Sequence, residues 1–145
     1  MAKTYRVTAT RRFGNRMMAG LLHFGIGPQS NYLLTTQGRK SGRRHTTPVS
    51  LVIGNGGRWL VAPYGAVGWV HNVRANGEAT LRRGRLTERV QADEVDTDVA
   101  ASVLRRYLQR ERIVRPYFDV TPDAELAAFA AIANRHPVFV LTSLR

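Results

Sequence analysis

The chain has 145 residues, 43% of them hydrophobic, which suits one globular domain with a buried core. It contains no cysteine, and this excludes disulfides, thiolate metal ligands and cysteine nucleophiles. The net charge is +12 and is unevenly placed: residues 1–77 hold eleven Lys and Arg with no Asp or Glu, whereas residues 78–145 hold eleven and ten. An anionic partner is therefore expected at the first half, such as a phosphorylated cofactor, an acidic membrane surface or nucleic acid.

The N-terminal segment predicts a basic lead-in over residues 1–10 and an amphipathic helix over residues 11–26. Apolar residues recur there every three or four positions, as on one helix face: Phe13, Met17, Leu21 and Phe24. No apolar run approaches the roughly 20 residues that a membrane-spanning helix needs, and no signal peptide is recognisable. The cytoplasm is the expected compartment. Peripheral contact of this helix with the inner membrane face is left open, beside packing of the helix onto the rest of the domain.

The remaining elements follow in chain order. Three strands are expected first, joined by a basic hairpin and then by an Asn-Gly-Gly turn, at residues 31–36, 45–53 and 58–63. A short helix over residues 69–75, a strand pair at 79–82 and 86–95, and a strand at 137–142 are also expected. Two longer helices are predicted before the last strand: one is capped at Asp96 and runs to about Gln109, and the other opens at Thr121 and runs to about Asn134. Their expected core residues are Val99, Val103, Leu104 and Leu108 in the first and Leu126, Phe129, Ala130 and Ile132 in the second. Several hairpins with few long helices favour an α+β fold, an antiparallel barrel with helices, in a single domain over residues 1–145.

The hairpin between the first two strands carries four cations and a hydroxyl, Arg39, Lys40, Ser41, Arg43 and Arg44. A turn needs glycine to relax the backbone, but it does not need positive charges that repel one another. Guanidinium groups and backbone N–H groups freed by glycine can hold phosphate or carboxylate. The segment predicts an anion-binding hairpin, and an ordinary solvated basic turn is an equal alternative. Its spacing matches neither a P-loop nor a dinucleotide-binding fingerprint.

A second stretch, residues 63–72, places two aromatic side chains and two glycines at the exit of a strand. Glycines let a flat ligand approach the main chain, and Tyr64 or Trp69 can stack on it. The alternative is that Trp69 is a core residue and Tyr64 a rim residue. A third candidate is Tyr117, which is followed by Phe118 in a loop between two helices, where it either covers a pocket or packs between the helices.

The chain is poor in catalytic groups of its own. His71 stands alone beside the second stretch, and no His, Asp and Glu cluster has metal-ligand spacing, so no metal is expected. No serine lies in a nucleophile motif, and no pair of carboxylates marks a cleft. This pattern is typical of an enzyme whose cofactor carries the chemistry.

Three short motifs together resemble one family. Leu-Thr-Thr-x-Gly-Arg-Lys-Ser-Gly at residues 34–42 is followed by Trp-x-x-Asn at 69–72 and Ala-Asn-Gly at 75–77. This combination is similar to the deazaflavin-dependent nitroreductase family, split β-barrel oxidoreductases of actinobacteria that use coenzyme F420. The match is close over residues 20–95 and looser in the C-terminal third. The fold that the resemblance implies is an antiparallel split β-barrel, of the kind that also binds flavin mononucleotide (FMN), with flanking helices.

The resemblance implies a role for each matching residue. Arg39, Lys40 and Ser41, with Gly42, would hold the phosphate and the acidic glutamyl tail of F420. The deazaflavin ring would lie against the strand end and loop formed by Ala62, Pro63, Tyr64 and Gly65. Trp69 and Asn72 would border the same cofactor site. Tyr64, Trp69 and Tyr117 are the candidates for the wall of the substrate pocket, and no catalytic residue is assigned.

The function expected from these observations is hydride transfer from reduced F420 to an electron-poor quinone, enone or nitro compound. An FMN oxidoreductase and a non-catalytic cofactor carrier are the alternatives. A nucleic-acid-binding module is disfavoured, because no aromatic residue lies between Tyr32 and Trp59 to interleave with the basic hairpin. The expected partners are therefore a small-molecule acceptor and, as an open alternative, a second copy of the chain.

Overall fold

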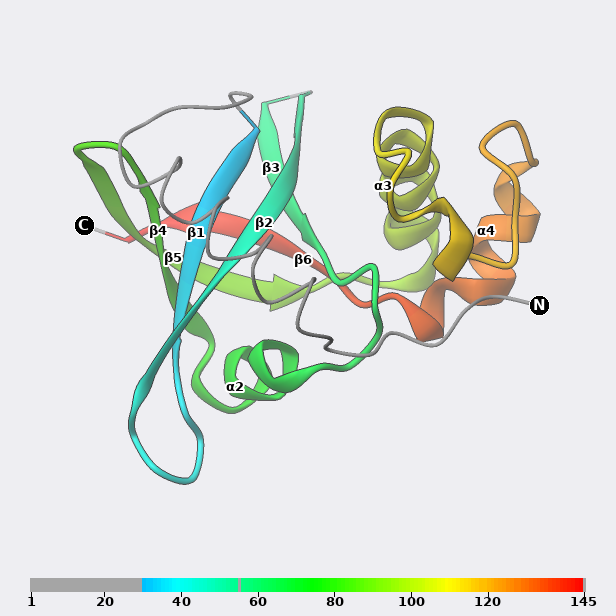
Figure 1. Ribbon diagram of the computed structural model, residues 1–145. Coiled ribbons are helices and arrows are strands. Elements are labelled where there is room, and N and C mark those ends of the chain that lie inside the picture. Colours follow the sequence, from blue (N-terminus) through cyan, green and yellow to red (C-terminus); the bar gives the residue numbers. More distant parts are fainter. Residues whose placement is uncertain (1–29, 55, 145) are drawn as a thin grey trace.

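The computed structural model describes residues 30–54 and 56–144, and six strands of this part form a closed barrel (Figure 1). Around the barrel the strands follow the order β1-β2-β3-β6-β5-β4, and every neighbouring pair is antiparallel. Their bounds are Asn31–Gln37 (β1), Arg44–Gly54 (β2), Gly57–Val61 (β3), Glu78–Arg83 (β4), Leu86–Glu94 (β5) and Val138–Ser143 (β6). The antiparallel split barrel of class α+β is therefore confirmed.

Helices cover one end and one side of the barrel. Helix α2 (Gly68–Asn76) lies across one end, while α3 (Thr97–Arg110) and α4 (Leu126–Ile132) pack together beside β2, β3 and β6 (Figure 1). Two short 3₁₀ helices, η1 (Arg115–Tyr117) and η2 (Ala133–Arg135), flank α4. None of the helices within the described ranges is long and apolar enough to cross a membrane.

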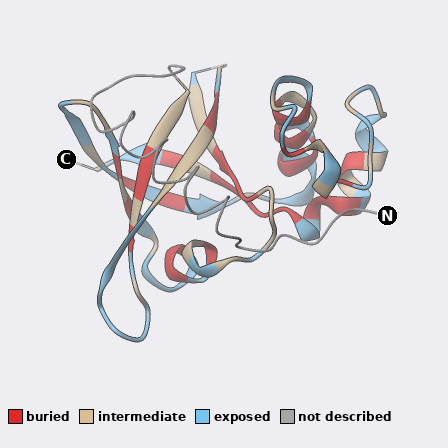
Figure 2. Ribbon diagram, in the orientation of Figure 1, coloured by how far each residue is buried: buried red, intermediate tan, exposed pale blue. Residues whose placement is uncertain are grey.

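Alternation along the strands builds two hydrophobic cores (Figure 2). Successive residues of a strand face opposite sides, so Leu51 and Leu60 point into the barrel, whereas Val52 and Val61 face α3 and α4. The inner core is closed by Val70 and Val73 of α2, and the outer one contains Leu104, Leu108 and Phe129. Each such buried side chain contributes about 1.5–3 kcal/mol to folding. One barrel wall therefore stabilises both cores and fixes the helices relative to the strands.

Three details differ from the sequence-based expectations, and a further expectation falls outside the described residues. The third strand ends at Val61 and not at residue 63, because the chain turns there into the loop that precedes α2. The second long helix begins at Leu126, and Leu126 itself is exposed. Val99 was expected in the core but is 40% exposed, since the buried stripe of α3 runs from Ala100 through Val103, Leu104 and Leu108. The helix expected over residues 11–26, and with it its membrane contact, lies outside the described residues.

His136 joins the outer core to the loop after β3, a contact that the sequence analysis did not foresee. It is 5% exposed, and its ring stacks on Phe118 with centroids 3.9 Å apart. The carbonyl oxygen of Pro63 lies 2.9 Å from Nδ1, so the neutral ring donates its Nδ1 proton there. Burial lowers the pKa of His136 to about 4, against the hydrogen bond to Pro63, which favours the charged form.

The pH dependence of stability tests this packing. Because the native pKa lies below the unfolded value of 6.5, the unfolded chain binds more protons between those two values. The free energy of unfolding should fall as the pH decreases from about 6.5 towards 4, with about 2 kcal/mol of the loss due to His136. Urea unfolding at several pH values measures it. His136→Gln should be less stable near neutral pH but should show a flatter pH profile. Equal slopes in both proteins would contradict the assignment.

Candidate functional site

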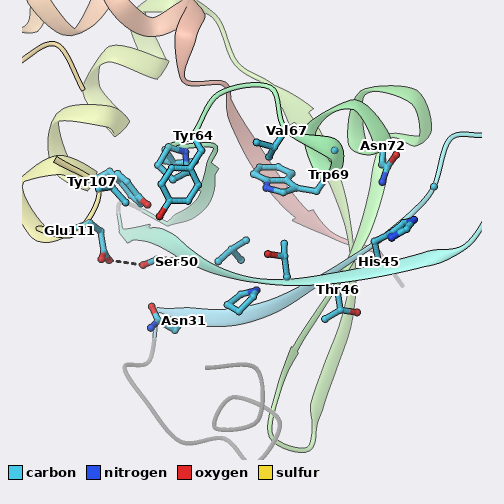
Figure 3. A pocket seen from close by; sticks show the side chains of 18 of the residues that line it. Asn31, His45, Thr46, Ser50, Tyr64, Val67, Trp69, Asn72, Tyr107 and Glu111 are labelled. Atoms are coloured by element: carbon cyan, nitrogen blue, oxygen red, sulfur yellow. Dashed lines mark hydrogen bonds between the residues drawn. The ribbon is translucent and has the colours of Figure 1, made fainter. Parts of the chain in front are cut away.

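One cavity of about 730 Å³ collects most of the predicted site residues (Figure 3). Its walls are the basic hairpin, the middle of β2, the segment from Pro63 to Trp69, and the last turn of α3 with the loop after it. Pockets of this size hold a drug-sized organic ligand. Of the ten expected cofactor-binding residues, the cavity is lined by Arg39, Lys40, Ser41, Pro63, Tyr64, Trp69 and Asn72.

The hairpin owes its shape to its own backbone. Gly38 N donates to Arg43 O at 2.7 Å, and Gly42 N donates to Gly38 O at 2.9 Å. Gly42 has φ +71°, a value that strains any residue with a side chain. Ser41 Oγ accepts a hydrogen bond from Arg43 N at 3.2 Å, so Ser41 also orders the turn. Gly42 does not line the cavity; its role in the site is to set the backbone.

The cations of the hairpin are not neutralised by any carboxylate of the described residues. Arg39, Lys40, Arg43 and Arg44 are exposed, and within residues 30–54 and 56–144 no carboxylate forms an ion pair with them. Arginines elsewhere in the described chain do have such partners: Arg58, Arg74, Arg89, Arg110 and Arg135. The hairpin therefore presents positive charge to the cavity and to solvent, where an anion can bind.

Two asparagines of α2 hold the hairpin in place. The Oδ1 atom of buried Asn72 accepts hydrogen bonds from Arg39 N at 3.2 Å and Arg39 Nη1 at 3.1 Å. Its Nδ2 donates to Oγ1 of buried Thr36 at 3.1 Å. Asn76 Nδ2 donates to the carbonyl oxygen of Gln37 at 2.9 Å. The distant sequence motifs thus form one unit: the Asn of Trp-x-x-Asn fixes the Arg of Gly-Arg-Lys-Ser-Gly, beside its role as a lining residue.

The loop after β3 forms the aromatic wall. Ala62 is buried behind it, and Ala62 N donates to Pro137 O at 2.8 Å. Gly65, with φ +87°, turns the chain so that Tyr64 and Val67 face the cavity, although Gly65 itself does not line it. Trp69 is partly buried, with its ring 6.0 Å from that of Phe139 in the barrel core. Trp69 therefore belongs both to the packing and to the cavity wall.

Tyr117 does not reach the cavity. It packs edge-to-face on Tyr64, with ring centroids 4.9 Å apart and planes at 81°, so it supports a wall residue from behind. His71 is exposed on α2 and also lies away from the cavity. Within the described ranges, no group of His, Asp and Glu is arranged to hold a metal ion.

Several lining residues were missed by the sequence analysis. His45, on β2, lies beside the hairpin, Tyr107 comes from the last turn of α3, and Glu111 is the residue that caps this helix (Figure 3). Ser50 Oγ donates to Glu111 Oε1 at 2.6 Å, which links β2 to that turn. Tyr107 has the spacing of a core residue on α3, so no signal in the sequence distinguishes it from the packing residues around it. Figure 3 shows these groups at the end of the cavity away from His45 and Asn72.

Removal of the Asn72 side chain tests the link between α2 and the hairpin. Asn72→Ala should lower the free energy of unfolding by about 1–3 kcal/mol, because Thr36 loses its buried partner. Hydrogen exchange of the Arg39 backbone amide should become faster, since its acceptor is gone. His71→Ala, a change at an exposed neighbour on α2, is the control. Unchanged exchange at Arg39 in Asn72→Ala would show that the hairpin holds its shape without α2.

Solved structures with a similar fold include reductases and other proteins. One, described as a domain-swapped dimer, is 21% identical with a TM-score of 0.59, over 92% of this chain and all of that chain. An F420-H2 dependent reductase is 23% identical with a TM-score of 0.52, over 79% of this chain and 95% of that chain. HutZ, a haem storage protein from Vibrio cholerae, is 12% identical with a TM-score of 0.56, over 81% and 83%. At these identities the likeness establishes the split-barrel fold alone.

The comparison with family models, which uses the sequence, distinguishes between these activities. The model of the family described as F420H(2)-dependent quinone reductase matches residues 4–141, nearly the whole chain. The family supports the deazaflavin coenzyme over the FMN alternative, and the unpaired cations and the aromatic wall of the cavity suit a flat ring with an anionic tail. The chain therefore belongs to the F420H(2)-dependent quinone reductase family, and it is an oxidoreductase with F420 as its coenzyme.

Proposed function

We propose that the chain reduces a quinone, or a related enone or nitro compound, with hydride from reduced F420. The observation that carries this proposal is the layout of the cavity. Cations without ion-pair partners lie at one end, and an aromatic wall formed by Tyr64 and Trp69 continues from them. A long cofactor with an anionic tail and a flat ring matches this layout, because its tail would lie on the cations and its ring against the aromatic wall.

The hairpin would bind the anionic part. Arg39 is the best-placed group, because Asn72 fixes both its backbone and its guanidinium at one edge of the cavity. A guanidinium held in advance loses little conformational entropy when it binds phosphate. Lys40 and the backbone amides near Ser41 would add further donors. FMN has a single phosphate and would use less of this surface than the phosphate and glutamyl tail of F420.

The aromatic wall would position the ring. When bound, reduced F420 supplies the hydride, and the acceptor takes up that hydride together with a proton. Pro63, Tyr64, Val67 and Trp69 would exclude water from the ring and hold it at a fixed distance from the acceptor. The loop that carries them is anchored from behind by the hydrogen bond between His136 and Pro63 and by Tyr117.

We also propose that the chain forms a homodimer. One structure of similar fold is described as a domain-swapped dimer, which supports a homodimer here. Sedimentation of the purified protein at several concentrations would distinguish a dimer from a monomer.

The hairpin is tested by fluorescence titration with oxidised F420, beside FMN. Arg39→Gln with Lys40→Gln should weaken F420 binding by about 30- to 700-fold, because two charge-assisted contacts of about 1.5–3 kcal/mol each are lost with some rescue by neighbouring cations. Added salt should reproduce part of the loss. Arg82→Gln with Arg85→Gln removes the same charge from the β4–β5 hairpin, outside the cavity, and should change little. Equal affinity in both double variants would refute the hairpin as the tail site.

Trp69→Ala tests the aromatic wall. Hydride transfer should slow by about 10- to 100-fold, because the ring loses its position, and the absorption spectrum of bound F420 should shift. Trp69→Phe keeps a flat wall and should retain most of the activity. Stopped-flow oxidation of F420H2, with circular dichroism as a check of folding, measures both effects. Normal turnover by the folded fraction of Trp69→Ala would leave Trp69 only a packing role.

A further inference from the structure

The end of the cavity opposite the hairpin has a different chemistry from the rest. Tyr107, Ser50 and Glu111 meet there, and Tyr64 faces them (Figure 3). A carboxylate at this end would repel the phosphate and glutamyl tail of a cofactor. The cationic end and the acidic end of the cavity therefore suit different ligand groups. The anionic tail of the cofactor suits the cationic end, so the acidic end is left for another ligand.

Tyr107 offers a hydroxyl group to a ligand in the cavity. The residue is 3% exposed and lines the cavity, and Figure 3 shows its hydroxyl pointing into the cavity beside that of Tyr64. The hydroxyl of Tyr64, another lining residue, lies next to it in that view, so the two phenols form one polar patch in an otherwise aromatic wall. Burial and the nearby Glu111 raise the pKa of Tyr107, so the phenol keeps its proton.

Glu111 places negative charge beside that hydroxyl. Its carboxylate accepts from Ser50 Oγ at 2.6 Å and lies 3.4 Å from Arg110 Nε. Arg110 also donates from Nη2 to the carbonyl oxygen of Leu51 at 2.6 Å, so its guanidinium is shared with the main chain of β2. The carboxylate is half-buried, and water screens it only in part. An anionic ligand group at this end would meet unfavourable charge.

We propose that Tyr107 and Glu111 form the acceptor subsite: the Tyr107 hydroxyl donates a hydrogen bond to a carbonyl oxygen of the acceptor, and the Glu111 carboxylate restricts the site to uncharged acceptors. The proposal rests on the proposed function, because it assumes that the acceptor lies in the same cavity as the F420 ring. It goes further by separating two roles. Tyr107 recognises the carbonyl group, whereas Glu111 excludes acidic analogues. The Tyr107 phenol acts as a hydrogen-bond donor and keeps its proton, and the proton that completes the reduction comes from solvent.

The first test measures binding without cofactor, so that it is independent of F420. A neutral naphthoquinone is titrated against the full chain, and quenching of tryptophan fluorescence is recorded, since Trp69 lies in the cavity wall. Tyr107→Phe should weaken binding by about fivefold, the value of one neutral hydrogen bond. Tyr32→Phe, at a tyrosine that does not line the cavity, should bind like the parent. Equal affinity in Tyr107→Phe and the parent would overturn the role of Tyr107.

The second test compares that quinone with its sulfonated analogue. Both are titrated in the background Arg39→Gln with Lys40→Gln, which reduces binding of the sulfonate to the hairpin. Glu111→Gln should improve sulfonate binding by about five- to tenfold and leave the neutral quinone within about twofold. Glu125→Gln, at an exposed carboxylate outside the cavity, should change neither. Unchanged discrimination in Glu111→Gln would overturn the exclusion of anions.

Steady-state kinetics and cofactor binding together show whether a failure concerns the acceptor subsite or the proposed function. With F420H2 present, Tyr107→Phe should lower kcat/KM for the quinone by about fivefold without changing the affinity for oxidised F420. A parent protein that binds neither F420 nor FMN would refute the proposed function, while the two quinone titrations would still decide the subsite. A parent that binds F420 tightly but shows no effect of Tyr107→Phe would refute the subsite alone.

Discussion

The site depends on one hydrogen-bonded residue, Asn72. Its amide joins helix α2 to the basic hairpin through Thr36 and through both the backbone and the guanidinium of Arg39. Four like charges on a short turn would otherwise favour an extended, mobile loop. The helix in turn is held by Val70 and Val73 in the barrel core. The position of the cations is thus set by the packing of the barrel, and not by the hairpin alone.

The barrel wall also positions the other end of the cavity, because it determines where α3 packs. Strand alternation sends Leu51 and Leu60 inward and leaves Val52 and Val61 to receive α3. This contact brings Tyr107 and Glu111 opposite the hairpin. Arg110 strengthens it by donating to the main chain of β2. The cavity therefore lies between two bodies, the barrel with α2 and the α3–α4 pair, and each supplies one charged end.

Most of the fold could be predicted from the sequence, because the hairpin turns and strand periodicity are local signals. The hairpin and the loop at Tyr64 and Trp69 were recognisable for a related reason: their glycines, charges and aromatic residues are unusual for plain turns. Tyr107 was not, since its spacing on α3 is that of a packing residue and only the tertiary structure turns its hydroxyl towards the cavity. Tyr117, for which the sequence left a pocket role and a packing role open, packs against Tyr64 and does not line the cavity.

The unpaired charge of the hairpin also has a consequence for the empty protein. Repulsion among Arg39, Lys40, Arg43 and Arg44 is a cost that the folded chain bears until an anion arrives. A ligand that binds only the folded state adds stability in proportion to the logarithm of its concentration. Binding of the cofactor would therefore make the folded protein more resistant to proteolysis, in addition to making it active. In a cell short of the coenzyme, the idle enzyme would be the form that is degraded first.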